Sequence, residues 1–423
     1  MEGNTQMNRF NERQIKTQLD NGLTVILHHK PGYNSTSALF GTHFGAMTLT
    51  QSIDGKRVDY PAGIAHFLEH KLFEPEEMDV LSAFTNMGAS ANAFTSYQET
   101  VCYFSTSQDY QQPLKTLLDF VQGFNTTADK IEKEKGIIAQ ELLMYQQMPQ
   151  FQLHMSLYKA MYHQLGLNQD IAGSLSSIEE TTLDDVLTAY EANYHPSQMV
   201  LSIVSHEPMA DVLTFIKENQ NQKIFRQAPS VQEILPNEPK EVVEPWVQLE
   251  MDVSIPKVAV GFKQDFVIKT EVDVFYHELY FKYLTALVFT GRNPLYQEWL
   301  DDNILADNFS VSYDVGLNYG FISFSNETKD AGYFKQFLID QLEAITINPL
   351  DFEAIKRRYL GESISSLEDA EDLMVDNFRA HKLGLDIFEQ IDALQSITLD
   401  DLNRFIKTLS TEHVSVVVIN NKE

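Results

Sequence analysis

The sequence contains very little cysteine and no long apolar segment. Its single cysteine, Cys102, excludes an intramolecular disulfide, as is typical of proteins from reducing compartments. No apolar run approaches the roughly 20 residues that a membrane-spanning helix needs. The first residues, MEGNTQMNRFNERQIK, lack the apolar core of a signal peptide. We therefore expect a cytoplasmic protein without a transmembrane segment.

Basic residues are also scarce. The chain has 31 lysines and arginines against 60 aspartates and glutamates, which gives a formal net charge of −29. This balance argues against a nucleic-acid partner, because too few cations are present to neutralise phosphates. The acidic excess has two interpretations: it coats a solvated surface and aids solubility, or part of it forms an acidic cavity that favours basic ligands.

The length of 423 residues suggests about two to four domains. Residues 216–247 are polar and contain four prolines, a composition typical of a linker. We therefore predict a first half over residues 1–215 and a second half over residues 248–423. Predicted strands and helices do not alternate strictly, which favours α+β halves over a doubly wound parallel sheet.

The two halves share a local pattern. The tetrapeptide Thr-Leu-Asp-Asp begins at Thr182 and again at Thr398. Threonine is a good helix N-cap, and acidic residues favour a helix N-terminus. Each predicted helix is followed at nearly equal distance by a β-branched strand, from Met199 and from Val414. Two matches in the same order indicate an internal duplication, although this tetrapeptide is also a common way to begin a helix.

Hydrophobic periodicity and turn residues place the other elements of the first half. The pattern predicts, in chain order, two strands around an Asn21-Gly22 turn in residues 19–32, a strand in 35–47, a helix in 63–74, two strands in 88–107, and helices in 110–124 and 128–148, the last ended by Pro149. The motifs that suggest chemistry lie on the helix in 63–74, the strands in 88–107 and the helix in 128–148.

The helix in 63–74 contains the pattern H-x-x-E-H. His66 and His70 share one helix face and can bind one ion, for which zinc is the usual choice. Glu69 lies on the same face, where its carboxylate can take a proton from a zinc-bound water. The pattern is the inverzincin signature. The alternative is a helix with two ordinary histidines and a surface glutamate, but twelve histidines in the chain make an accidental match rare.

A catalytic zinc needs a third protein ligand. The helix in 128–148 offers Glu132, Glu134 and Glu141, of which the last two lie seven residues apart on one face. A glutamate among apolar neighbours such as Ile138 is costly unless it is paired or binds metal. We predict Glu141 as the third ligand of one zinc per chain. Glu134 would orient a ligand by a hydrogen bond, or would be an ordinary solvated charge.

These motifs resemble the pitrilysin/insulinase family of zinc metallopeptidases, which includes the mitochondrial processing peptidases. The matching stretches are HFLEH in residues 66–70, GASANAFTS in 88–96 and EKEKGIIAQE in 132–141. GIAHFLEHKLFE, residues 63–74, is most similar to the bacterial YmfH-type subgroup. The resemblance implies two homologous halves, each a mostly antiparallel sheet flanked by helices. It also implies zinc ligands at His66, His70 and Glu141 and a catalytic base at Glu69.

The stretch SANAFTS alternates between two faces of a strand. Asn92 and Phe94 lie on one face, and the small residues Ala91 and Ala93 on the other leave room for another backbone. The family resemblance implies that this strand is a sheet edge that pairs with an extended substrate peptide. The alternative is an interior strand that binds no ligand.

The second half lacks the H-x-x-E-H pattern, so we expect no second metal site there. In the family, an arginine and a tyrosine of this half reach the substrate. Arg379 is the candidate for the arginine here, and no tyrosine follows it within a turn or two. An ordinary salt bridge is the alternative role for Arg379.

The sequence thus predicts a zinc endopeptidase that hydrolyses peptides or small unfolded proteins, with peptide maturation as one narrow role. The rival hypothesis is a non-catalytic or partner-dependent subunit of a peptidase heterodimer. The intact motif favours the enzyme. The resemblance further implies a homodimer or a heterodimer with a related chain, because this chain supplies two of the four domains that close a chamber in the family.

Overall fold

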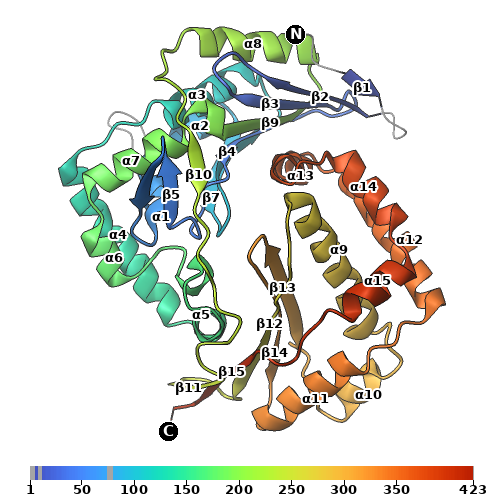
Figure 1. The fold of residues 1–423 in the computed structure, drawn as a ribbon. Coiled ribbons are helices and arrows are strands. Elements are labelled where there is room, and N and C mark those ends of the chain that lie inside the picture. Colours follow the sequence, from blue (N-terminus) through green and yellow to red (C-terminus); the bar gives the residue numbers. More distant parts are fainter. Residues whose placement is uncertain (1–4, 8–11, 74–79, 423) are drawn as a thin grey trace.

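The computed structural model of the protein describes residues 5–7, 12–73 and 80–422. Residues 1–4 and 8–11 of the predicted first half, and Glu74 at the end of the motif stretch, lie outside the described residues. The chain forms two halves, each with a sheet and packed helices (Figure 1). The predicted α+β class is therefore confirmed, and none of the helices in the described part combines the length and apolar composition that a bilayer crossing requires.

The first half contains the predicted elements and several that the sequence did not indicate, but the strand before the Asn21-Gly22 turn is Arg13–Gln18, ahead of the predicted range 19–32. Its strands are β1 (Thr5–Met7), β2 (Arg13–Gln18), β3 (Thr24–His29), β4 (Thr36–Thr42), β5 (Thr50–Ile53), β6 (Lys56–Asp59), β7 (Ala89–Thr95), β8 (Thr100–Thr106) and β9 (Met199–Ser205). Its helices are α1 (Ile64–Leu72), α2 (Val80–Asn86), α3 (Gln111–Gln122), α4 (Ala128–Gln146), α5 (Pro149–Met161), α6 (Leu175–Glu180), α7 (Leu183–Asn193) and α8 (Met209–Asn221). Pro149 ends the predicted helix and begins α5, since proline is tolerated at the first position of a helix.

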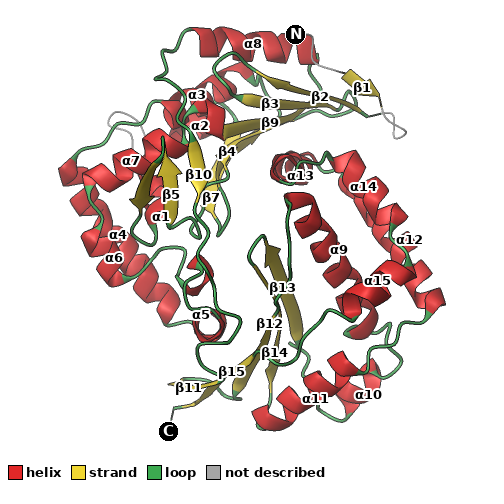
Figure 2. Ribbon diagram, viewed as in Figure 1, coloured by secondary structure: helices red, strands yellow, loops and turns green. Residues whose placement is uncertain are grey.

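The second half repeats this arrangement with fewer strands. Its strands are β11 (Trp246–Met251), β12 (Lys257–Lys263), β13 (Ser310–Gly316), β14 (Tyr319–Glu327) and β15 (Val414–Asn421). Its helices are α9 (Glu271–Val288), α10 (Tyr296–Asp301), α11 (Ala331–Glu343), α12 (Pro349–Ser366), α13 (Ala370–Lys382), α14 (Ile387–Ser396) and α15 (Leu399–Ile406). Figure 2 shows these helices and strands in the same view.

The sheet topology supports the internal duplication. The first sheet has the order β1-β2-β3-β9-β4-β8-β7, and the second has the order β11-β15-β12-β14-β13. From β3 and from β11 onwards, the first pair in each sheet is parallel and the later pairs are antiparallel. The helices that precede β9 and β15 also begin alike, with reciprocal capping boxes at Thr182 and Thr398. The two halves are therefore topological copies.

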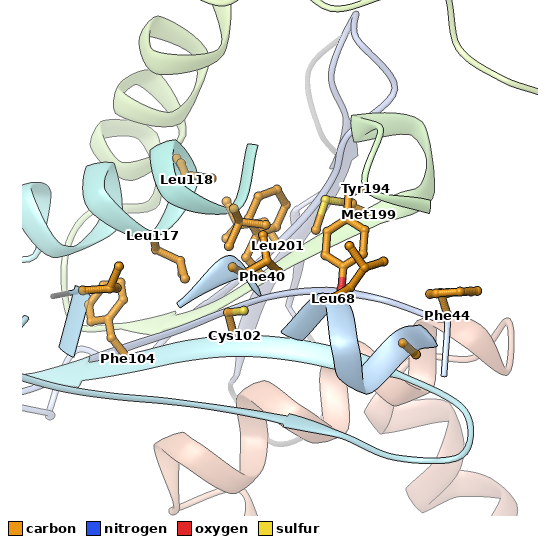
Figure 3. Close-up of a cluster of buried hydrophobic side chains, with 14 of the residues drawn as sticks. Phe40, Phe44, Leu68, Cys102, Phe104, Leu117, Leu118, Tyr194, Met199 and Leu201 are labelled. Carbon is orange, nitrogen blue, oxygen red and sulfur yellow. The ribbon is translucent and has the colours of Figure 1, made fainter. Parts of the chain in front are cut away.

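Each half has its own apolar core. Figure 3 shows part of the first, where Leu68 of α1 and the free thiol of Cys102 lie among side chains of β4, β8, α3 and β9. The core of the second half contains large aromatic side chains such as Phe281 and Phe324. Full burial of side chains of this size stabilises a fold by about 1.5–3 kcal/mol each.

Each half also contributes a helix to the sheet of the other half (Figure 1). Leu157 and Met161 of α5 pack against the second sheet, where they contact a cluster that includes Val417. Phe378 of α13 packs against the first sheet in a cluster that includes Leu39. Helix α5 directly follows α4 in the first half, and α13 directly follows α12 in the second half. Since each of the two packs on the sheet of the other half, the exchange is reciprocal. The two sheets are therefore covered on one face by their own helices and on the other by a helix from the opposite half.

Glycines mark both positions where an exchanged helix crosses a sheet. A Cβ atom added to Gly261 of β12 would lie 2.5 Å from Sδ of Met161, and one added to Gly41 of β4 would lie 2.9 Å from Cε2 of Phe378. The two glycines occupy equivalent positions, since each pairs with the second residue of β9 or of β15. The close approach of helix to sheet thus belongs to the duplicated unit.

The predicted linker, residues 216–247, is only partly a connection. Helix α8 crosses the predicted boundary and ends at Asn221. Near this end Asn219 and Gln220 are buried: Asn219 donates a hydrogen bond to Asp119 at 3.0 Å, and Gln220 donates one to Gln122 at 2.9 Å. The short strand β10 (Val231–Glu233) then pairs with β5. Polar composition misled the prediction here, since these side chains satisfy one another inside the fold.

Candidate metal centre

The H-x-x-E-H motif lies on α1. The apolar residues of this helix are buried in the core of the first half, whereas His66, Glu69 and His70 stay partly exposed. The helix begins after Gly63, whose φ of 90° lies in the left-handed region that favours glycine. A Cβ atom at this position would also lie 2.4 Å from the carbonyl oxygen of Ala172. Glycine at position 63 therefore fixes where the motif helix begins.

Helix α4 brings two glutamates to the motif helix. Glu134 is only 4% exposed and lies beside Ile138 on the buried face of α4, so its interpretation as a solvated charge is wrong. Glu141, two turns later, is half-buried. Glu132 instead points to solvent and accepts a hydrogen bond from Lys135 at 2.7 Å. The helix thus presents Glu134 and Glu141, but not Glu132, to the two histidines.

The side chains of His66, His70 and Glu141 converge. Nε2 of His70 lies 3.3 Å from Oε2 of Glu141, and Nε2 of His66 lies 3.9 Å from Oε1. One ligand atom from each of the three residues lies within 4.8 Å of the others. The 3.9 Å separation is too long for a hydrogen bond. Two imidazole nitrogens and one carboxylate oxygen are a donor set typical of catalytic zinc, and these residues fit such an ion.

Glu134 orients the imidazole of His70. Its Oε1 lies 3.0 Å from Nδ1 of His70, and its Oε2 accepts a hydrogen bond from Nζ of Lys71 at 3.2 Å. Burial alone would raise the pKa of Glu134, but these hydrogen bonds and the charge of Lys71 lower it. Because an ionised carboxylate only accepts, Nδ1 of His70 carries a proton, and Nε2, once it is unprotonated, is the nitrogen left to bind a metal. This is the tautomer that a metal-binding histidine requires.

The charges around the histidines favour a cation. Among the described residues, the carboxylates of Glu69, Glu134 and Glu141 and the ammonium of Lys71 sum to a charge of −2 if both imidazoles are neutral. Burial, together with the neighbouring His70, lowers the pKa of His66 to about 4. Burial opposes protonation of His70 as well, but the surrounding carboxylates raise its pKa above the ordinary value. A divalent ion would balance this charge.

The carboxylate of Glu69 is held by the end of strand β7. Oγ1 of Thr95 donates a hydrogen bond to Oε2 of Glu69 at 2.6 Å. Burial raises the pKa of Glu69, and the hydrogen bond from Thr95 opposes that rise. The carboxylate thus lies beside the two histidines without bonding to either, at a position from which it can accept a proton.

Strand β7 is the edge of the first sheet in the described part of the chain. Ser96 and Glu99 are a hydrogen-bonded pair at the turn, where the Ser96 N–H donates to the Glu99 carbonyl oxygen at 2.8 Å. Since hydrogen-bonded and non-hydrogen-bonded pairs alternate along an antiparallel ladder, the backbone groups of Ala91 and Ala93 point away from β8. Consistent with this, the Ala93 N–H donates to Oδ1 of Asn92 at 2.9 Å rather than to β8.

The two faces of β7 differ as the sequence pattern predicts. Ala91 and Ala93 pack against the core that contains α1, whereas Phe94 packs against the cluster that includes α13. Since β7 lies at the edge of the first sheet in the described part of the chain, it is not an interior strand there. Binding of substrate by Ala91, Asn92, Ala93 and Phe94 stays a prediction.

Arg379 of α13 joins the two halves. Its Nε and Nη2 atoms donate to Oε1 of Glu99 at 2.9 and 2.7 Å, and the side chain of Arg379 remains 52% exposed. It lines a cavity of about 470 Å³ between the halves together with the carboxylates of Glu278 and Asp314. The salt-bridging interpretation describes the contact of Arg379 in this structure, and its contact with substrate stays a prediction.

Sequence reasoning did not assign Thr95, Lys71 or Glu99. Their partners lie 26, 63 and 280 residues away, where no local spacing indicates them. One signal was present for Lys71, which occupies an apolar position of the α1 stripe and is 2% exposed. A lysine at such a position indicates a buried cation with a partner.

Comparison with known proteins agrees with this geometry. Residues 55–174 match the insulinase family, peptidase family M16, and residues 180–359 match the peptidase M16 inactive domain. The chain is 32% identical to the uncharacterized zinc protease YmfH of Bacillus subtilis over 405 residues, which are 94% of each chain. It is also 29% identical over 161 residues to the human mitochondrial-processing peptidase subunit beta, covering 36% of this chain and 33% of that one.

A solved structure has the same fold. The M16-like peptidase of Alicyclobacillus acidocaldarius superposes with a TM-score of 0.93 at 29% sequence identity, over 99% of this chain and 100% of that one. The match extends across both halves and therefore includes the second, motif-free half. The chain belongs to the insulinase family of peptidases, family M16.

Proposed function

We propose that the protein is a zinc endopeptidase that hydrolyses peptides or small unfolded proteins. The observation that carries this proposal is the convergence of His66, His70 and Glu141, with Glu69 beside them on α1. The zinc-protease name of the Bacillus subtilis relative supports it. The second half contributes no H-x-x-E-H pattern, in keeping with its match to a domain described as inactive.

The residues of the site divide the chemistry between them. Zinc held by His66, His70 and Glu141 would lower the pKa of a water towards about 7 and polarise the scissile carbonyl. Glu69 takes the proton from the attacking water and gives it to the leaving amine as the C–N bond breaks. Among the described residues only Thr95 hydrogen-bonds Glu69, through Oε2, so Oε1 is available for this transfer.

The open edge of β7 supports an extended peptide as substrate. The outward backbone groups of Ala91 and Ala93 can pair with a peptide strand, and the side chain of Asn92 would release the Ala93 N–H when the peptide binds. A folded protein cannot present such a strand without unfolding. The net charge of −29 adds a preference for basic peptides, through steering that weakens with salt.

The rival role as a non-catalytic subunit is not favoured, because the three residues of the motif and the third ligand Glu141 are all present. Dependence on a partner is a separate matter. We infer a dimer, of this chain or with a related chain, since the family resemblance gives a closed chamber four domains and this chain supplies two. Light scattering tests this inference, and a strict monomer with full peptidase activity would end it.

The single buried Cys102 supports a reducing compartment such as the cytoplasm.

The proposed function is tested with the purified chain and a set of substrates. Unstructured fluorogenic peptides should be cleaved in the presence of zinc, and removal of the metal by a chelator should stop cleavage. Compact, stable domains should survive under the same conditions. Absence of cleavage by a zinc-loaded chain, alone and with a related partner chain, would contradict the proposal.

A further inference from the structure

The contact between Thr95 and Glu69 joins two functional elements of the site. Thr95 is the last residue of β7, and Glu69 lies on α1 within the motif. The distance of 2.6 Å between Oγ1 of Thr95 and Oε2 of Glu69 is within the range of hydroxyl–carboxylate hydrogen bonds, which are shorter and stronger than neutral ones.

The direction of this hydrogen bond is fixed by its surroundings. Oγ1 of Thr100 lies 3.5 Å from Oγ1 of Thr95 and donates its hydrogen to the carbonyl oxygen of Phe44 at 2.9 Å. A hydroxyl has one hydrogen to donate, and an ionised carboxylate donates none. The hydrogen of Thr95 therefore goes to Glu69 at 2.6 Å, the nearer acceptor, since Oγ1 of Thr100 is 3.5 Å away.

The position of Thr95 on the strand makes the contact specific. Ala91, Ala93 and Thr95 share the face of β7 that looks toward α1, and the alanine side chains have no hydrogen-bonding group. A glutamate side chain has three rotatable bonds, so a single strong hydrogen bond at one oxygen removes much of its freedom. The same strand carries the open edge at which the proposed substrate pairs.

We propose that Thr95 is a positioning residue for Glu69: its hydroxyl holds one carboxylate oxygen so that the other faces the reacting water. This inference rests on the proposed peptidase function. Loss of the hydroxyl leaves the three metal-binding side chains and the backbone edge of β7 unchanged. It removes only the restraint on the carboxylate of Glu69. We therefore expect kcat to fall while KM and the affinity for zinc stay unchanged.

The test compares Thr95→Val, which keeps the shape but removes the hydroxyl, with Thr95→Ser, which keeps the hydroxyl. Valine should lower kcat about 10- to 100-fold with KM within about twofold, and serine should restore kcat to within about threefold of the wild type. The matched control is Thr106→Val at the other end of the hairpin, where the hydroxyl donates to the Gly88 carbonyl oxygen. This control should lose stability without losing kcat.

A second readout does not depend on turnover. In the inactive Glu69→Gln background, the affinity for an uncleaved peptide and the zinc content should be the same with and without Thr95→Val. Weaker peptide binding would make Thr95 a substrate contact and overturn the proposal, as would an unchanged kcat in Thr95→Val. Peptide cleavage by the wild-type chain tests the proposed peptidase function, and the Thr95 variants test the positioning role. Failure of the positioning role can therefore be distinguished from failure of the peptidase function.

Discussion

Nδ1 of His70 lies 3.0 Å from Oε1 of Glu134, and the other oxygen of the same carboxylate accepts a hydrogen bond from Lys71. One buried acid therefore contacts two consecutive residues of the motif helix. The arrangement fixes the ring orientation of His70 and keeps a proton on its Nδ1 before any ion binds. Its contribution to metal binding can be measured independently of catalysis.

Glu134→Gln should weaken zinc binding by about 10- to 100-fold, the range typical of partners that orient a metal-binding histidine. The amide keeps the size of the side chain but loses the charge that holds the proton on Nδ1 of His70. Competition with a chelator of known affinity measures the change. Glu132→Gln is the matched control, since Glu132 lies in solvent on the same helix. Equal zinc affinity in both variants would contradict the role of Glu134.

Ala93→Pro should reduce turnover of peptides much more than Ala93→Ser. The Ala93 N–H points away from β8, so proline removes a donor for the substrate without breaking the ladder between the two strands. Steady-state kinetics with a fluorogenic peptide compares the variants, and circular dichroism verifies that both are folded. A folded proline variant that cleaves at the wild-type rate would show that this edge does not hold the substrate.

Gly261→Ala should destabilise the fold by about 1–3 kcal/mol, because the added methyl group overpacks the contact between β12 and the exchanged helix α5. Gly291→Ala is the control, since no atom lies within 4 Å of a Cβ at that position, and its effect should stay within about 0.5 kcal/mol. Urea unfolding of the two variants measures the difference. Equal stability would mean that α5 does not pack closely on the second sheet.

The protein should lose stability in mild acid through two buried imidazoles. Burial lowers the pKa of His43 to about 3, with Lys382 adding to the shift, and lowers the pKa of His381 to about 4, with Lys16 adding to it. An unfolded histidine titrates near 6.5, so the unfolded state binds protons first as the pH falls. The contribution of these two histidines to the free energy of unfolding is therefore fully present above about pH 6.5. It declines toward pH 4 by up to about 1.4 kcal/mol per pH unit for each group.

His43→Phe tests this pH dependence. Both ring nitrogens of His43 are buried without a hydrogen-bond partner among the described residues. The ring lies 4.3 Å from that of Phe378, centroid to centroid and tilted by 34°, so phenylalanine is a close substitute. Unfolding free energies at pH 7 and pH 5 should differ less in the variant than in the wild type. An identical loss of stability in both proteins would assign the acid sensitivity to other groups.

Local patterns made part of the site visible in the sequence. His66, Glu69 and His70 share one turn of one helix, where spacing alone places them on one face. Glu134 and Glu141 were distinguishable because they recur at helical spacing among apolar residues. The contact between α1 and α4 then follows from burying both apolar faces in one core.

Long-range pairings left no such pattern. The bond from Thr95 to Glu69, the ion pair of Arg379 with Glu99, and the exchange of α5 and α13 between sheets all join segments whose own sequences are compatible with many partners. The end of α8 was mistaken for linker for a related reason. Its polar residues are buried because other polar side chains meet them, which depends on the fold and not on composition.

The central claim is that three side chains bind zinc and a fourth does the acid–base chemistry. Zinc content and peptide turnover measured together on the wild type, His70→Ala and Glu69→Gln test it most directly. We predict one zinc per chain in the wild type and in Glu69→Gln, little or none in His70→Ala, and a loss of turnover of at least about 100-fold in Glu69→Gln. Stoichiometric zinc in His70→Ala, or near-normal turnover in Glu69→Gln, would contradict the account.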